Sequence, residues 1–250
     1  MVFQKKLKMI KKEQKMKIIV LKKRVVFGVI ALVFAILIFT LIILGATSTQ
    51  AMVPVNQKVV VIDVGHGGRD VGVVGSLGTK ESELNLIIAQ KLKEKFEKAG
   101  LFVVLTRENN EGLYESDAKN KKDSEMKKRK EIIQNNDPDF VISIHANQFP
   151  SDSTRRGAQV FYDEFNKEGK VLSEKIQDNL NVLNKEKTGR VCENLSGDFF
   201  VLKCTTKPSV LIECGFLSNE DDEKLLIDSK YQDQLTFAIY SGLIAFLEEK

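Results

Sequence analysis

The stretch VVVIDVGHGG, at residues 59–68, decides the fold. Its short β-branched run is closed by glycines, which predicts a buried strand over 59–64. Residues 82–99 follow with an apolar residue at every fourth position and a glycine just past the end, which predicts an amphipathic helix. The apolar positions are Leu84, Ile88, Leu92 and Phe96, and the closing residue is Gly100.

The same alternation of short apolar runs and periodic helical runs continues toward the C-terminus. The predicted strands are 101–106, 140–144, 158–162, 199–203 and 209–214, and the predicted helices are 125–136, 167–184 and 230–248. Strands separated by helices indicate a mainly parallel sheet that is covered on both faces. We therefore expect a single α/β domain over 58–250, with a central, mainly parallel or mixed sheet flanked by helices.

The charge of the chain is unevenly distributed. Residues 1–24 contain ten Lys or Arg and one Glu, whereas the remaining residues contain 28 Lys or Arg and 33 Asp or Glu. The main body is therefore acidic, which argues against nucleic acid as a partner. Three cysteines are too few for a disulfide-built scaffold. The sequence leaves a Cys192–Cys204 disulfide as an alternative, but it favours three unpaired thiols.

The N-terminal region predicts attachment to a membrane. Residues 25–46 carry no charge, and as a helix they span roughly 33 Å, enough for a bilayer core of about 30 Å. The basic tail at 1–24 is expected to stay in the cytoplasm, so the body lies outside it. An uncleaved anchor is favoured over a cleaved signal peptide because cleavable apolar regions are usually shorter. Residues 47–57 read as a linker.

The chain has two histidines, and each follows a predicted buried strand. His66 comes after 59–64 and His145 comes after 140–144. Because the carboxyl ends of parallel strands share one edge of a sheet, these two residues are expected to be neighbours in space. Imidazole nitrogens at such an edge indicate a shared metal site. A catalytic zinc has three protein ligands and one open position.

A carboxylate at the same edge would complete the ligand set. Glu81 is the candidate because it begins the helix that follows the first strand, although Glu83 competes for this role. Glu213 ends another apolar strand, where a carboxylate is costly to bury without a partner. We therefore expect Glu213 to act as a general base beside the metal, with a structural ion pair as the alternative. Cys214 should point to the opposite face of that strand.

Several blocks of the sequence, in this order, resemble the zinc-dependent N-acetylmuramoyl-L-alanine amidases. The blocks are VVVIDVGHGGRDVGVVG, GTKESELNL, LTR, the region of Arg129, VISIHAN, GAQVFY and KPSVLIECGFLSN. The resemblance runs from about residue 58 to 247. It implies a single α/β domain with a zinc site at the sheet edge. It also implies cleavage of the amide between the lactyl group of muramic acid and the first L-alanine of the stem peptide.

The resemblance also assigns roles to individual residues. His66, Glu81 and His145 match the zinc ligands of the family, which favours Glu81 over Glu83. Glu213 matches the catalytic glutamate. Asn147 and Arg156 lie near the same edge in the sequence pattern and are predicted, on weaker grounds, to contact the substrate.

A lean, anchored domain without wall-binding repeats most resembles the CwlD-type sporulation amidases. Their action on spore cortex peptidoglycan prepares muramic acid for muramic-δ-lactam formation. This resemblance places the domain between the mother-cell and forespore membranes, with peptidoglycan as substrate. A regulatory protein on the same membrane surface is a further expected partner. The alternatives are a vegetative amidase for cell separation or wall turnover, and a zinc carboxypeptidase of related α/β fold. A wall-binding module without activity is disfavoured because all four site residues are present.

Overall fold

The computed structural model describes residues 57–249 and a few isolated earlier positions, which are 9, 11–13, 16, 32 and 34. The predicted tail at 1–24, apolar segment at 25–46 and linker at 47–57 therefore lie almost entirely outside the described residues. Within the described part of the chain, no helix combines the length and apolar character that crossing a membrane requires.

A six-stranded mixed sheet forms the centre of the domain, in the order β2-β1-β3-β6-β4-β5. The first four strands of this order run parallel to one another, β4 runs antiparallel to β6, and β5 runs parallel to β4. The strands are β1 (Val59–Val64), β2 (Phe102–Leu105), β3 (Phe140–Asn147), β4 (Gln159–Tyr162), β5 (Leu195–Ser196) and β6 (Ser209–Phe216). The predicted fold class is confirmed.

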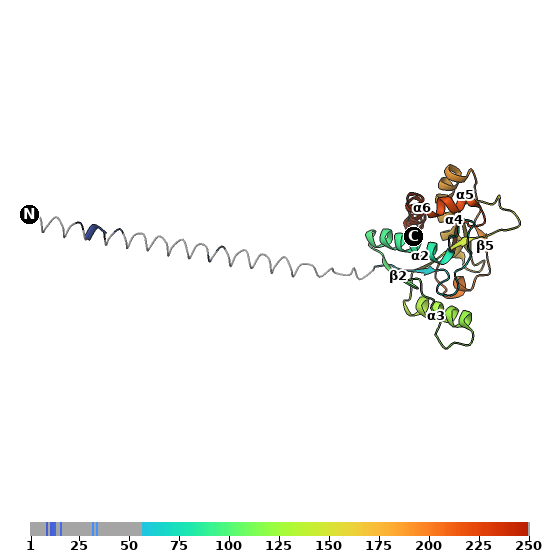
Figure 1. The fold of residues 1–250 in the computed structure, drawn as a ribbon, viewed down its shortest axis with the longest axis horizontal. Coiled ribbons are helices and arrows are strands. Elements are labelled where there is room, and N and C mark those ends of the chain that lie inside the picture. Colours follow the sequence, from blue (N-terminus) through green and yellow to red (C-terminus); the bar gives the residue numbers. More distant parts are fainter. Residues whose placement is uncertain are drawn as a thin grey trace, which may run out of the picture. The chain divides into compact units, whose positions relative to one another are not determined.

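Helices cover the two faces of the sheet unequally. The larger core lies between one face and α2, α4 and α6, and the smaller core lies between the other face, α3 and a short 3-10 helix. In Figure 1, α3 lies apart from the other labelled helices. The helices are α2 (Glu81–Lys98), α3 (Lys121–Asn135), α4 (Lys167–Thr188), α5 (Glu220–Ile227), α6 (Ser229–Glu248) and the 3-10 helix η1 (Phe200–Lys203).

Side-chain alternation along the central strands assigns residues to these two faces. Ile62, Ile142 and Ile212 belong to the larger core, whereas Val61, Val141 and Leu211 belong to the smaller one. Glu213 shares the face of Leu211, and Cys214 is buried on the opposite face, as expected. The parallel strands β1, β3 and β6 therefore bring the ends of three sequence blocks to one edge of the sheet.

Two predictions about secondary structure were wrong or incomplete. The predicted strand at 199–203 is the 3-10 helix η1, in which the adjacent residues Val201 and Leu202 are both buried rather than alternating. Helix α3 begins at Lys121, earlier than predicted, because the Asn120 side chain caps it by accepting a hydrogen bond from the Asp123 N–H. The short elements α5 and β5 were not predicted, and the three cysteines are unpaired.

Candidate active site

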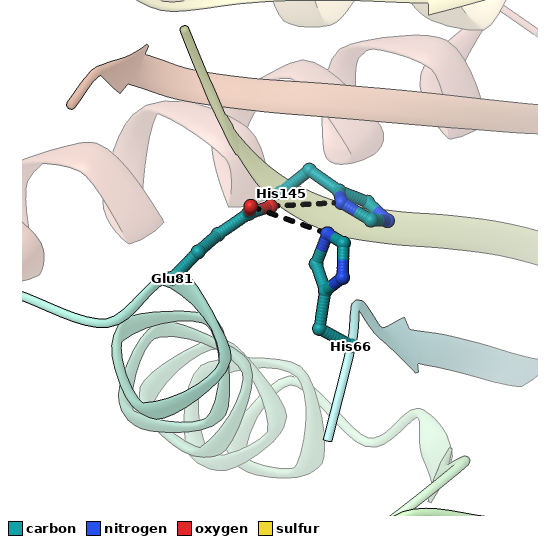
Figure 2. A group of neighbouring side chains, drawn as sticks. All are labelled: His66, Glu81 and His145. Carbon is teal, nitrogen blue, oxygen red and sulfur yellow. Dashed lines mark hydrogen bonds and ion pairs between the residues drawn. The ribbon is translucent and has the colours of Figure 1, made fainter. Parts of the chain in front are cut away.

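Three side chains from distant parts of the chain meet at the edge of the sheet (Figure 2). His66 follows β1, Glu81 is the first residue of α2, and His145 lies inside β3. The two imidazole centroids are 5.0 Å apart. The Glu81 carboxylate contacts both rings, with Oε2 at 3.2 Å from His66 Nε2 and Oε1 at 3.0 Å from His145 Nδ1. One potential ligand atom from each residue lies within 4.8 Å of the others, so this group could hold a metal ion.

Two buried arginines fix the backbone that carries His66. The φ angle of His66 is 58°, a left-handed conformation that is uncommon for residues other than glycine. Arg107 Nε and Arg129 Nη2 both donate to the His66 carbonyl, at 2.7 and 2.8 Å. A strained backbone conformation of this kind persists only where surrounding contacts stabilise it, and here the two hydrogen bonds to the His66 carbonyl do so. These hydrogen bonds hold the loop in the conformation in which the imidazole faces Glu81.

Glu81 is held almost immobile by its neighbours. Its side chain is 3% exposed. Oε2 accepts a hydrogen bond from the Val73 N–H, and Oε1 accepts from the Ala146 N–H and the Asn85 amide. These donors come from the loop before α2, from β3 and from α2 itself, so the carboxylate is fixed relative to both histidines.

Two glycines leave the space that these side chains occupy. A Cβ at Gly65 would lie 2.4 Å from the His145 ring, and a Cβ at Gly72 would lie 2.4 Å from Glu81 Oε2. Real Cβ atoms do not approach other atoms so closely. Because Gly65 and Gly72 have no Cβ, the side chains of His145 and Glu81 can lie close to the backbone of this loop.

The acidic groups around His66 concentrate negative charge. Burial alone would lower its pKa, but Glu81 and Asp70 raise it to about 9. The Asp70 carboxylate lies 2.9 Å from Nδ1, the ring nitrogen that does not face Glu81. Such a carboxylate orients a metal-ligating imidazole and increases its basicity.

A proton and a divalent cation compete for a site of this kind, since metal ligands bind in their deprotonated forms. The donor set of two imidazoles and one carboxylate fits zinc.

Glu213 lies next to His145 across the sheet. The two residues are directly paired in the register of β3 and β6. Burial is the main reason that the pKa of Glu213 rises to about 7. Its Oε2 atom is buried and makes no hydrogen bond within the described residues. An unpartnered buried carboxylate oxygen argues against the alternative of a structural ion pair, and the raised pKa suits a group that accepts and donates protons near neutrality.

The three candidate metal ligands and Glu213 are not equally accessible from the surface. A pocket of about 450 Å³ is lined by His66, His145 and Glu213, together with residues of α3 and η1. Glu81 is buried and does not line the pocket. A ligand in this pocket would therefore reach the open side of the candidate metal site and the carboxylate of Glu213.

The two weaker predictions of substrate contact fall elsewhere. Arg156 pairs with Asp222 at 2.9 Å and with Asp221 at 3.3 Å, and it lines a separate hollow. Asn147 lies at the end of β3, where its side-chain oxygen accepts from the N–H of Gln148. Neither residue lines the pocket of His66 and Glu213, and a role in substrate binding stays a prediction.

A buried ionic network beneath the histidines was not predicted. Asp63 on β1 accepts hydrogen bonds from Arg129 at 2.5 Å and from Ser143 at 2.7 Å. Burial alone would raise the pKa of Asp63, but Arg129 and Ser143 hold it below its usual value. Glu125 is the second partner of Arg129, at 2.8 Å. The signal was present in the sequence, since Asp63 is a carboxylate within an apolar strand, as Glu213 is.

Comparison with known proteins agrees with this geometry. The family model described as N-acetylmuramoyl-L-alanine amidase matches residues 60–245. The chain therefore belongs to the N-acetylmuramoyl-L-alanine amidase family. This confirms the family predicted from the sequence.

Within the family, the chain is similar to a germination-specific amidase and to a CwlD amidase. It is 34% identical over 200 residues to the germination-specific N-acetylmuramoyl-L-alanine amidase of Bacillus subtilis, covering 79% of this chain and 83% of the relative. It is also similar to the solved CwlD amidase of Clostridioides difficile in complex with the GerS lipoprotein, with 39% identity and a TM-score of 0.72. That similarity covers 78% of this chain and 100% of the solved one. The predicted resemblance to the CwlD type is confirmed.

A third relative is much longer than this chain. The amidase LytC of Bacillus subtilis is 31% identical over 201 residues, which cover 80% of this chain but 37% of LytC. This chain therefore shares with LytC a segment much shorter than the whole of LytC.

Proposed function

We propose that the chain is a zinc-dependent amidase of the spore cortex. In this proposal it hydrolyses the amide between the muramic acid lactyl group and L-alanine, on the way to muramic-δ-lactam. The observation that carries the proposal is the convergence of His66, Glu81 and His145 beside the unpartnered carboxylate of Glu213. The family match favours amide cleavage at this bond over the carboxypeptidase alternative.

His66, Glu81 and His145 would hold the zinc ion. When bound, zinc lowers the pKa of a coordinated water and polarises the carbonyl of the scissile amide. The chain's own contribution is to keep the three ligands in place before the ion arrives. Arg107 and Arg129 hold the His66 backbone, and the N–H groups around Glu81 fix its carboxylate.

Glu213 would move the proton. In its ionised form, the Glu213 carboxylate would accept a proton from the attacking water and then donate it to the leaving amine of L-alanine. Burial favours the protonated form of this carboxyl, which makes the second transfer easier. The hydrogen-bonded neighbours of Glu81 leave that carboxylate ionised, so the two glutamates have separate roles.

The cortex assignment and the location are also proposals. Similarity to the germination-specific amidase and to CwlD supports the cortex as the site of action. The charge-free segment at 25–46 and the basic tail at 1–24 support a membrane anchor with the catalytic domain outside the cytoplasm. In a sporulating cell this places the domain between the mother-cell and forespore membranes. The complex of CwlD with a lipoprotein supports a regulatory protein partner on the same membrane surface.

Product analysis tests the chemistry. The zinc-loaded full-length chain, incubated with peptidoglycan, is expected to release intact stem peptides that begin with L-alanine, detected by mass spectrometry. Glu213→Gln is expected to bind zinc normally and to release no peptide. Release of single amino acids, or near-full activity of Glu213→Gln, would contradict the proposal.

Muropeptide analysis of spores tests the cortex assignment. Spores from a strain that lacks the gene are expected to contain no muramic-δ-lactam, and expression of the wild-type chain is expected to restore it. Unchanged muramic-δ-lactam would exclude the cortex role and favour a vegetative amidase.

A further inference from the structure

The catalytic pocket extends well beyond the candidate metal ligands. Its outer wall is formed by Lys122 and Met126 of α3 and by Phe199 and Phe200 at the start of η1. Three of these four side chains are apolar and Lys122 carries an exposed ammonium group, while Asp198, which also lines the pocket, pairs with Lys203. The pocket therefore has a reactive end, at Glu213, and a second region that the hydrolytic chemistry does not use.

Lys122 is the cation of this pocket that remains available to a ligand. The other lining cation, Arg129, is buried and engaged by Asp63 and Glu125. Within residues 57–249, no hydrogen bond or ion pair is found for the Lys122 ammonium. Its neighbours differ, since Lys121 donates to the Ser116 carbonyl and Lys128 pairs with Glu131.

The stability of α3 does not explain a lysine at this position. Lys122 lies in the first turn of the helix, where the positive end of the helix dipole disfavours a cation. Its spacing of four and seven residues from Met126 and Arg129 places it on the side of α3 that faces the sheet and the pocket. An unpaired cation on that side is therefore available to an anionic group of a ligand in the pocket.

The substrate class of the proposed function supplies such an anion. After L-alanine, the stem peptide carries the free carboxylate of its second residue. One residue of extended chain spans about 3.5 Å, so this carboxylate lies roughly 7 Å from the scissile amide. A pocket of about 450 Å³ that holds Glu213 and Lys122 together can accommodate this separation.

We propose that Lys122 binds the carboxylate of the second stem-peptide residue and makes the enzyme prefer acidic stem peptides to amidated ones. This inference rests on the proposed amidase function and assigns one end of the peptide to the wall formed by α3 and η1. Met126 and Phe200 would cover the apolar part of the peptide.

The test uses two muramyl tripeptides that differ only in the second residue, which carries either a carboxylate or an amide. The zinc-loaded full-length chain is expected to show a KM about two- to fivefold lower for the acidic peptide, the size of an exposed charge pair. Lys122→Gln is expected to abolish this difference with little change in kcat, and Lys122→Arg to retain it. High salt should reduce the preference of the wild type.

Lys127→Gln is the matched control. Lys127 is an exposed lysine on the same helix that lines a different hollow, so its loss should leave the preference unchanged. Equal KM values for both peptides in the wild type, or an unchanged preference in Lys122→Gln, would overturn the inference and leave the amidase function standing. Cleavage of neither peptide by the zinc-loaded wild type would overturn both.

Discussion

Gly72→Ala is expected to damage the metal site through a single added methyl group. A Cβ at this position would lie 2.4 Å from Glu81 Oε2 and 2.8 Å from His66 Cδ2. Reaching even 3.0 Å requires a shift of about 0.6 Å in Glu81, whereas metal sites tolerate about 0.2 Å. Glu81 has no room to move because the N–H groups of Val73 and Ala146 hold it. We expect zinc affinity to fall by roughly 10–100-fold or more, the range for losing a partner of a metal ligand.

Gly78→Ala separates this contact from backbone strain. Both glycines have left-handed φ angles, 66° at Gly72 and 87° at Gly78, and both lie between β1 and α2. Alanine in this conformation costs about 1–2 kcal/mol at either position. A Cβ at Gly78 has no atom within 4 Å, so this variant should lose stability only and keep its zinc affinity. The measurements are zinc affinity by competition with a chromogenic chelator and the free energy of unfolding in urea. Equal zinc affinities for the two variants would refute the reasoning.

Two further predictions concern residues that support the site. Asp63→Asn should cost about 3–5 kcal/mol at pH 7, because it breaks a buried ion pair with Arg129. Since the folded-state pKa of Asp63 is lowered, its contribution is present above the unfolded value and is lost as pH falls through the folded one. The difference in unfolding free energy between wild type and variant should therefore shrink below about pH 4, and a constant difference would contradict this. Glu223→Gln should weaken zinc binding, because buried Glu223 accepts hydrogen bonds from the Leu77 and Thr79 N–H groups in the loop that leads to Glu81. The loss of one of these bonds costs about 1–3 kcal/mol, and an unchanged zinc affinity in a chelator titration would count against it. Glu220→Gln, on the exposed side of the same helix, is the control.

The strands and helices that build the larger core were predictable because their patterns are strong. The β-branched run at 59–64 and the fourfold spacing in 82–99 each match one structure only, and both predictions are confirmed to within a residue. The 3-10 helix η1 was missed because FFVLK has the composition of a strand. Its conformation depends on packing Val201 and Leu202 beneath β6, and no local pattern records that contact.

The convergence of His66 and His145 was predictable from topology. Two strands that run parallel in one sheet must end at the same edge, and the register of β1 with β3 shows this. The choice between Glu81 and Glu83 was not fixed by spacing, because it depends on where α2 begins. The Glu81 N–H donates a hydrogen bond to the Val73 carbonyl, and the Glu81 side chain points inward. Glu83 instead pairs with Lys80 at the surface.

The role of Arg107 could not be predicted from the sequence, for a different reason. Arg107 donates to the carbonyl oxygens of Gly65, His66 and Ser82, and backbone acceptors leave no signature in the identities of residues. A buried arginine of this kind is recognised only when the strands are assembled around it.

Anomalous diffraction at the zinc absorption edge, from crystals of the zinc-loaded protein, tests the central claim most directly. We expect one strong peak per chain, about 2.0–2.2 Å from one nitrogen each of His66 and His145 and from an oxygen of Glu81. A peak bound by other residues, or no peak at this edge of the sheet in crystals soaked with excess zinc, would contradict the account.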